Sequence, residues 1–346
     1  MVPTAISVLQ GGLNGLTEYL SGHVLTCLVP AIFIAGAISI FLSQAAILKY
    51  FGPQANKWLA YSIASVSGAI LAVCSCTVLP LFAGIYKKGV GLGPAVAFLY
   101  SGPAINILAI VYTARLLGYD LGAARAIGAI IFAIVIGLAM ATIFQRGEAK
   151  RTSQAFAVVS PANTNSKAGW KLIIYFALLV GILISGAQKN WAALGALIAL
   201  LSIVLWRWFT KEEVIDWLKS TGSFAKIIVP WLIGGVFIAG ILKVVIPESV
   251  IAGFLGGNSL QANATASVSG ALMYFATLTE VPILRSFMDL GMGHGPALAL
   301  LLAGPAVSLP NMLALRSIIG IKKTTVYVLF TVIMATFSGF IFGIIR

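Results

Sequence analysis

Long apolar segments separated by short polar ones make up almost the whole chain. A helix rises about 1.5 Å per residue, so roughly 20 apolar residues are needed to cross about 30 Å of hydrocarbon. The pattern therefore predicts an all-α polytopic membrane protein. The segments that we expect to span the membrane are 24–48, 95–117, 126–144, 172–187, 191–206, 227–246, 296–315 and 324–345.

Two further apolar stretches, 58–86 and 262–284, are each interrupted by a proline. The first of them contains no charged residue. We expect both to be re-entrant broken hairpins, which leave the membrane on the side where they enter, so that the chain has about eight spans. The alternative is that each stretch crosses as one tilted helix, which gives ten spans and parallel repeats.

The composition agrees with a membrane protein and excludes several other classes. Of the 346 residues, 60% are hydrophobic and 9% are charged, whereas a soluble domain has about 25% charged residues. The net charge of +13 lies mostly in short loops, which favours contact with anionic lipid headgroups over nucleic-acid binding. Three cysteines cannot form a disulfide framework. No nucleotide-binding P-loop occurs, and we expect no cleavable signal peptide.

The chain contains an internal repeat. Residues 64–106 align with 266–308 without a gap and share 18 of 43 positions, many of them glycine or proline. Two related halves around a midplane site are typical of secondary transporters. The predicted organisation is a first transmembrane repeat at 1–145, a polar cytoplasmic linker at 146–171 and a second transmembrane part at 172–346, with its repeat at 211–346.

The distribution of Lys and Arg distinguishes the two topologies. If both broken stretches are re-entrant, the basic residues divide 16 to 6 between the two sides, and if both cross, they divide 13 to 9. The positive-inside rule favours the larger asymmetry. An odd number of crossings then separates the two copies, so the repeats are expected to be inverted, with both termini outside.

Cys74 and Cys76 flank Ser75 within the uncharged stretch 58–86. Thiols and thiolates suit soft species such as Cu(I) or trivalent arsenic, and an extended turn would let both sulfur atoms reach one such ligand. The motif does not predict a zinc site, because zinc takes four ligands and no histidine is near in sequence. The simpler alternative is that these cysteines only pack as small residues.

Glu280 is the only acid deep within an apolar segment, at the position that Val78 occupies in the first copy. An ionisable residue inside a membrane is costly and indicates a functional site. A buried carboxyl group favours its neutral, protonated form, so Glu280 is a candidate proton carrier. The alternative is a structural carboxylate held by a neighbouring Thr hydroxyl or by Arg285.

Helix breaks that recur in both copies are expected to line a cavity, because freed backbone groups are tolerated there. The alternative is that Gly and Pro only permit close helix packing. The residues that we expect at the breaks are Pro80, Gly102, Pro103, Pro282, Gly304 and Pro305. The candidate solute-binding residues are Cys74, Ser75, Cys76, Thr77, Asn106, Thr279, Ser308 and Asn311.

Five motifs carry a resemblance to a known family, and together they extend over most of the chain. They are Cys-Ser-Cys-x-x-x-Pro-Leu-Phe-Ala-Gly at 74–84, Gly-x-Gly-x-Gly-Pro-Ala at 89–95, Ser-Gly-Pro-Ala-Ile-Asn at 101–106, Glu-Val-Pro at 280–282 and Ala-Gly-Pro-Ala-x-Ser-Leu-Pro-Asn-Met at 303–312. With these motifs, the chain resembles the YraQ/ArsP-like predicted permeases.

The resemblance implies a small-solute permease in the inner membrane of a prokaryote. The family's best-known branch exports trivalent organoarsenicals, and its dependence on cysteine would carry over here to Cys74 and Cys76 only. We therefore expect a proton-coupled transporter for a small thiophilic or sulfur-containing solute, with no cofactor, no metal and no nucleic-acid partner. A homo-oligomer is compatible with the sequence. A membrane thiol oxidoreductase and a passive channel are the alternative functions.

Overall fold

A computed structural model describes residues 5–21, 28–41, 56–71, 75–145, 147, 169–245, 254–273 and 280–346. Within these ranges the chain folds into helices joined by turns and has no β-strand beyond isolated bridges. This confirms the predicted all-α class. Most of the predicted linker at 146–171 lies outside the described residues.

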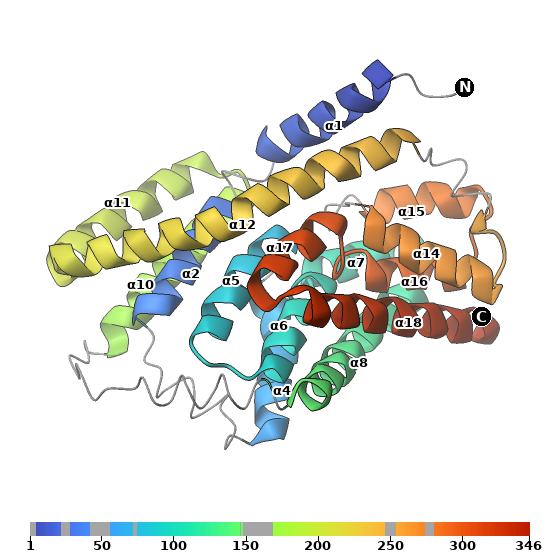
Figure 1. Cartoon of the computed structure of the whole chain (residues 1–346), viewed down its shortest axis with the longest axis horizontal. Helices are drawn as coiled ribbons and strands as arrows, with labels where there is room; N and C mark the ends of the chain where they lie inside the picture. Colours follow the sequence, from blue (N-terminus) through green and yellow to red (C-terminus); the bar gives the residue numbers. More distant parts are fainter. Residues whose placement is uncertain are drawn as a thin grey trace.

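In the first half, α4 and α5 pack on α6 and α7 packs on α8, whereas α1 and α2 pack on α12 of the second half (Figure 1). Their bounds are α1 Ala5–Tyr19, α2 Val29–Phe41, α4 Lys57–Leu71, α5 Ser75–Lys87, α6 Leu92–Ala104, α7 Ile107–Leu117 and α8 Tyr119–Ile143. Two helices follow, α10 Gly169–Ala187 and α11 Trp191–Trp208. The second half contains α12 Lys211–Val245, α14 Leu260–Leu272, α15 Glu280–Asp289, α16 His294–Ala303, α17 Leu309–Ile319 and α18 Ile321–Ile345.

In the described part of the chain, four helices are long and apolar enough to cross a membrane: α8, α11, α12 and α18. A fifth span results if α6 and α7, which meet at an angle of 45°, are counted as one broken span. The helices α2, α10, α16 and α17 are apolar but shorter. The membrane-protein class is therefore supported, while the predicted total of eight spans stays a prediction.

The internal repeat reappears in the helix bounds. Helices α17 and α18 begin and end 202 positions after α7 and α8, and α16 begins 202 positions after α6. Gly118 and Gly320, which join these last two helices in each half, both have a positive φ, 114° and 84°. Glycine adopts this conformation without the steric cost that a Cβ would add. The same turn chemistry therefore ends α7 and α17.

Equivalent glycines allow equivalent helices to pack closely in both halves. Helix α6 packs on α8, and α16 packs on α18. A Cβ on Gly93 of α6 would lie 2.9 Å from the carbonyl oxygen of Gly137 on α8. Its equivalent on Gly295 would lie 2.6 Å from the carbonyl oxygen of Gly339 on α18. Close approach through small residues is a general means of packing helices in membranes.

The contacts between the halves are reciprocal. Helix α5 packs on α17, its equivalent α15 packs on α7, and the long helices α8 and α18 contact each other. The Tyr100 hydroxyl donates a hydrogen bond of 2.9 Å to the carbonyl of Leu302, 202 positions later. This hydrogen bond therefore joins equivalent positions of α6 and α16 across the contact between the two copies.

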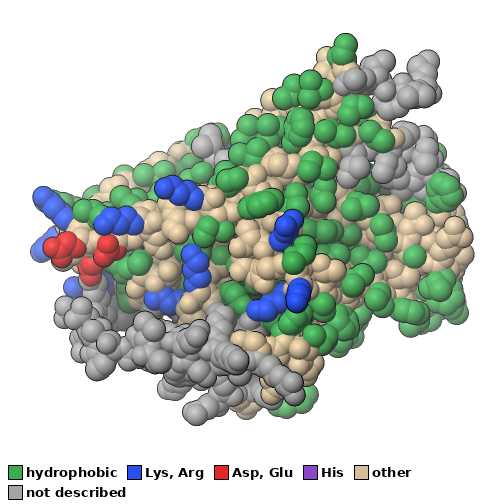
Figure 2. Space-filling view, viewed as in Figure 1, with side chains coloured by type: hydrophobic (Ala, Val, Ile, Leu, Met, Phe, Trp, Pro, Cys, Tyr) green, Lys and Arg blue, Asp and Glu red, His purple; other side chains and the backbone are tan. Residues whose placement is uncertain are grey.

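Helix α12 is continuous over 35 residues and contains Pro230. It begins at a capping box, in which the Thr210 N–H donates to the Glu213 carboxylate (2.8 Å) and the Glu213 N–H donates to the Thr210 hydroxyl (3.3 Å). Figure 2 shows Lys and Arg side chains gathered toward the end of the molecule where α12 begins. The opposite end of the same face is mostly hydrophobic.

Candidate functional site

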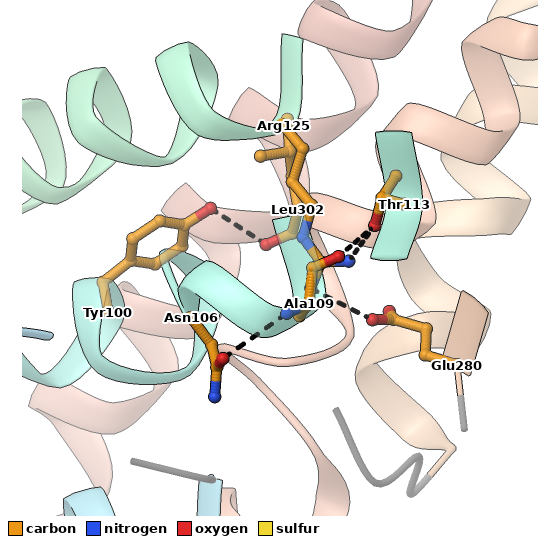
Figure 3. Close-up of polar contacts among 7 residues, drawn as sticks. All are labelled: Tyr100, Asn106, Ala109, Thr113, Arg125, Glu280 and Leu302. Carbon is orange, nitrogen blue, oxygen red and sulfur yellow. Dashed lines mark hydrogen bonds and ion pairs between the residues drawn. The ribbon is translucent and has the colours of Figure 1, made fainter. Parts of the chain in front are cut away.

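Two buried charged side chains from different halves meet at the interface between the repeats. Arg125 lies on α8 and Glu280 is the first residue of α15 (Figure 3). Arg125 Nη2 is 3.4 Å from Glu280 Oε2, and the side chains are 0% and 1% exposed. Among the described residues, no other charged side chain is buried. The pair is therefore the centre of the candidate site.

Helix α7 supplies the second partner of Arg125. Arg125 Nη1 donates a hydrogen bond to Thr113 Oγ1 (3.0 Å), and the Thr113 hydroxyl donates to the carbonyl of Ala109 (2.7 Å). Because that hydroxyl proton is already used, the oxygen of Thr113 presents its lone pairs to the guanidinium. Asn106 sets the start of α7, since its Oδ1 accepts hydrogen bonds from the N–H groups of Leu108 (3.0 Å) and Ala109 (3.4 Å).

Part of the hydrogen-bonding capacity of the ion pair is unused. Within the described ranges, neither Arg125 Nε nor Glu280 Oε1 has a hydrogen-bond partner, although both atoms are buried. Glu280 Oε1 lies beside the break between α16 and α17, where a Cβ on Gly304 would be only 2.8 Å from it. The glycine thus leaves the space that the carboxylate occupies.

The sequence pattern does not identify Arg125 as a site residue. The expected span begins at residue 126, which leaves Arg125 in a loop, as one of the six basic residues on the less basic side. Helix α8 begins earlier, at Tyr119, so Arg125 lies inside it and is fully buried. A lone acid in an apolar segment needs a counter-charge. A search for a basic residue next to or within another apolar segment would have identified Arg125 as the candidate partner of Glu280.

Arg285 is not the partner of Glu280, and that alternative is wrong. Its side chain is 54% exposed, its Nε lies 3.1 Å from Asp289 Oδ1, and it donates to the carbonyl of Leu116 (3.4 Å). Arg285 and Glu280 share α15 but are five positions apart rather than three or four, so the two side chains point in different directions.

A second group of buried polar side chains lies at the start of α17. Ser308 and Asn311 are buried, and Ser308 Oγ and Asn311 Oδ1 have no hydrogen-bond partner within the described residues. Asn311 lines a small cavity of about 10 Å³ together with Leu79 of α5 and Tyr327 of α18. A cavity of this size holds about one water molecule. The contact surface between α5 and α17 therefore contains unsatisfied polar groups.

The cysteine motif is only partly within the described residues. Cys74 and Thr279 lie outside them. Ser75 and Cys76 begin α5, with side chains outside the described part, and Thr77 is buried. The solute-binding role of these residues stays a prediction. No group of three or more His, Cys, Asp and Glu side chains converges among the described residues.

The residues expected at helix breaks have different positions. Gly304 follows α16 directly, and Pro305 lies in the break before α17. Pro103 lies inside α6 with Gly102, and the chain leaves that helix at Ile105 and Asn106. Pro80 is inside α5. Pro282 is in the first turn of α15, where the missing N–H of a proline leaves no hydrogen bond unmade.

Comparison with known proteins gives one family. Residues 10–344 match the family model ArsP_1, described as a predicted permease. The UPF0718 protein MJ0584 of Methanocaldococcus jannaschii is 44% identical over 357 residues, which cover 98% of this chain and 97% of that protein. The UPF0718 protein YraQ of Escherichia coli is 27% identical over 273 residues, 78% of this chain and 63% of that protein. No solved structure matches the chain.

Proposed function

The chain belongs to the family of predicted permeases, and from this premise we propose that it is a proton-coupled secondary transporter for a small thiophilic or sulfur-containing solute. The observation that carries the proposal is the buried ion pair between Arg125 and Glu280. It joins one half of a duplicated frame to the other beside the helix break at Gly304. Broken helices at the interface of two repeats are where transporters bind solute and coupling ion.

The ion pair gives the two halves a contact that one proton can change. While Glu280 is charged, Arg125 holds α15 against α8. When Glu280 takes up a proton, most of this attraction is lost, and breaking a buried pair costs about 3–5 kcal/mol. A free-energy difference of that size changes the equilibrium constant between two states by a factor of about 10² to just under 10⁴. Glu280 then carries the proton, and the separation of α15 from α8 changes the side from which the site is reached.

The thiophilic end of the solute is assigned to the first half. Cys74 and Cys76 supply soft sulfur ligands, and a trivalent organoarsenical is a solute of matching chemistry. Thr77 lies two positions before Leu79 on α5, and Leu79 and Asn311 line the same small cavity. The unsatisfied oxygens of Ser308 and Asn311 support a polar path on the α17 side of this contact. Asn106 and Thr279 complete the proposed set of solute-binding residues.

The repeats are proposed to be inverted, with the two-fold axis in the membrane plane. Helices α4 and α5 are the arms of one re-entrant hairpin, and both pack on α6. Helices α14 and α15 are the equivalent arms, and both pack on α16. All four are shorter than a span. The chain then lies in the prokaryotic inner membrane with residues 146–171 in the cytoplasm.

The proposed transport is tested with the purified protein in proteoliposomes. With an imposed pH difference, vesicles containing the protein should move phenylarsine oxide, a neutral trivalent organoarsenical, faster than vesicles without it, and dissipating the gradient should remove the difference. Thiosulfate is the parallel sulfur-containing probe. If the wild-type protein moves neither probe, with or without the gradient, the permease proposal is rejected.

Labelling of single introduced cysteines in a cysteine-free variant should place Lys49→Cys and Lys88→Cys on the same, cytoplasmic side. The reason is the excess of basic residues on that side under the re-entrant topology, 16 against 6. Because Arg125 is buried and does not lie in a loop, the ratio becomes 16 to 5. The measurement is protection from a membrane-impermeant thiol reagent in intact cells. Arg346→Cys, at the C-terminus, should be labelled from outside. Labelling of residues 49 and 88 from opposite sides restores the ten-span topology.

A further inference from the structure

Arg125 is a permanent positive charge inside the protein, and its counter-charge can be neutralised. A guanidinium keeps its proton at any physiological pH, whereas one proton neutralises a carboxylate. The side chains of Arg125 and Glu280 are 0% and 1% exposed, so water screens neither charge. If Glu280 alone takes up a proton, an uncompensated cation is left among apolar side chains, which is costly. Proton uptake is therefore favoured when a second negative charge arrives.

The guanidinium has donors available for such a charge. Its one contact with Glu280 joins Nη2 and Oε2 at 3.4 Å, and Nη1 is bonded to Thr113. Arg and carboxylate groups frequently form two parallel hydrogen bonds, and the second is missing here. Arg125 Nε is buried and has no hydrogen-bond partner within the described residues. Arg125 can thus bind an anion through Nε and Nη2 while Nη1 keeps its hydrogen bond to Thr113.

The ion pair is not needed to build the fold. The positions equivalent to Arg125, Glu280 and Thr113 in the other half are Tyr327, Val78 and Leu315. Helices α8 and α18 have matching bounds all the same. Tyr327 and Leu315 line the small cavity beside Asn311, so the equivalent site is mostly apolar. Because the fold forms with uncharged residues at this position, the charges in the other half point to a ligand.

We propose that Arg125 binds the negatively charged group of a small anionic solute in exchange for Glu280, an inference that rests on the permease function proposed above. One proton from solution adds to a carboxylate oxygen of Glu280, and one monoanion takes the place of that carboxylate beside Arg125. The net charge of the site is unchanged. Within the proposed solute class, Arg125 selects sulfur-containing anions over neutral arsenicals.

The other titratable groups around the pair do not replace Glu280. Tyr100 of α6 lies beside the pair and donates its proton to the carbonyl of Leu302. Tyr327 of α18 lies beside Tyr100 and donates to the carbonyl of Ala306 (3.2 Å). On the packed helices α7, α15 and α16, the remaining titratable side chains are exposed: Tyr112, Arg115, Arg285, Asp289 and His294.

Two probes that differ in charge test the inference on the purified full chain. Mercaptoacetate is a monoanion, and mercaptoacetamide is its neutral analogue of similar size. Calorimetric titration in buffers of different ionisation enthalpy measures both the affinity and the protons taken up. Wild-type protein should bind mercaptoacetate with uptake of about one proton and should bind the amide at least about tenfold more weakly. Thiosulfate is titrated in the same way as a second anion.

Variants of Arg125 and Glu280 test whether this pair is responsible for anion binding and proton uptake. In R125Q/E280Q, which removes both charges together, affinity for mercaptoacetate should fall about 30-fold or more. E280Q should still bind the anion but without proton uptake. If the double variant does not fold, this single variant shows whether Glu280 is the group that takes up the proton. R285Q removes an exposed arginine of the same helix as Glu280 and should behave as wild type.

Three results would overturn the inference: neither anion binds to the wild-type protein, the amide binds as tightly as mercaptoacetate, or the double variant folds and keeps its affinity. Failure of the permease proposal gives a different pattern. Anion binding with proton uptake but no flux of any probe leaves the Arg125 site intact and rejects the transporter. Gradient-driven flux of phenylarsine oxide, without anion binding, rejects the Arg125 site and leaves the transporter.

Discussion

Replacing Glu280 with Gln is expected to abolish uphill transport while leaving solute exchange at equal pH largely intact. The Gln side chain keeps the shape of Glu280 but cannot release a proton, so the proton gradient no longer drives the cycle. A difference of one pH unit supplies about 1.4 kcal/mol per proton, enough for about tenfold accumulation of solute. The accumulation ratio of the variant should fall to about 1, measured as flux into proteoliposomes with an imposed pH gradient.

Glu280→Asp is the graded control for this experiment. The aspartate keeps a titratable carboxyl group but is one methylene shorter, so the contact of 3.4 Å with Arg125 lengthens. Part of the coupled transport should remain. If the Gln variant concentrates solute as well as the wild type does, or if the gradient leaves wild-type flux unchanged, Glu280 is a structural carboxylate and coupling depends on another group.

Serine at Cys74 and Cys76 together is expected to abolish transport of phenylarsine oxide while leaving the protein folded. A serine hydroxyl is nearly as large as a thiol but is a hard ligand, so affinity for a soft species is lost. Each single Cys→Ser change should have most of the effect, because two sulfur atoms are proposed to bind one arsenic atom. Flux in proteoliposomes and the thermal unfolding temperature are measured on the same preparations.

Cys27→Ser is the matched control, since it makes the same substitution in the third cysteine of the chain. Its flux should equal that of the wild type. Normal transport by the Cys74/Cys76 double serine variant would remove the soft-ligand site from the proposal. The permease family and the Glu280 coupling would then stand without an arsenical substrate.

Helix type, helix position and the family could be predicted from the sequence, because they depend on local pattern. Apolar runs of a given length predict helices of that length, and α8, α11 and α18 lie where such runs occur. The two copies keep their glycines and prolines, so the repeat reappears in equivalent helix bounds. The resemblance to predicted permeases is confirmed by the family match over residues 10–344.

Glu280 could be identified as unusual from the sequence, but its partner could not. A carboxylate within an apolar segment can be recognised from the sequence alone. The choice between Arg285 and Arg125 as its partner depends on which helices pack together. The neighbour on the same helix is exposed, and the true partner is 155 positions away. The exposed arginine keeps its hydration, while the buried one needs a counter-charge.

By itself, the sequence determined the class of fold, the duplication and the presence of one acidic residue, Glu280, within an apolar segment. Each of these follows from residue type and spacing along the chain. The tertiary structure decided the rest of the site. Packing of α8 against the second half buries Arg125 beside Glu280, and the break after α16 leaves room for the carboxylate at Gly304. Such pairing depends on distances in space, to which sequence separation gives no guide.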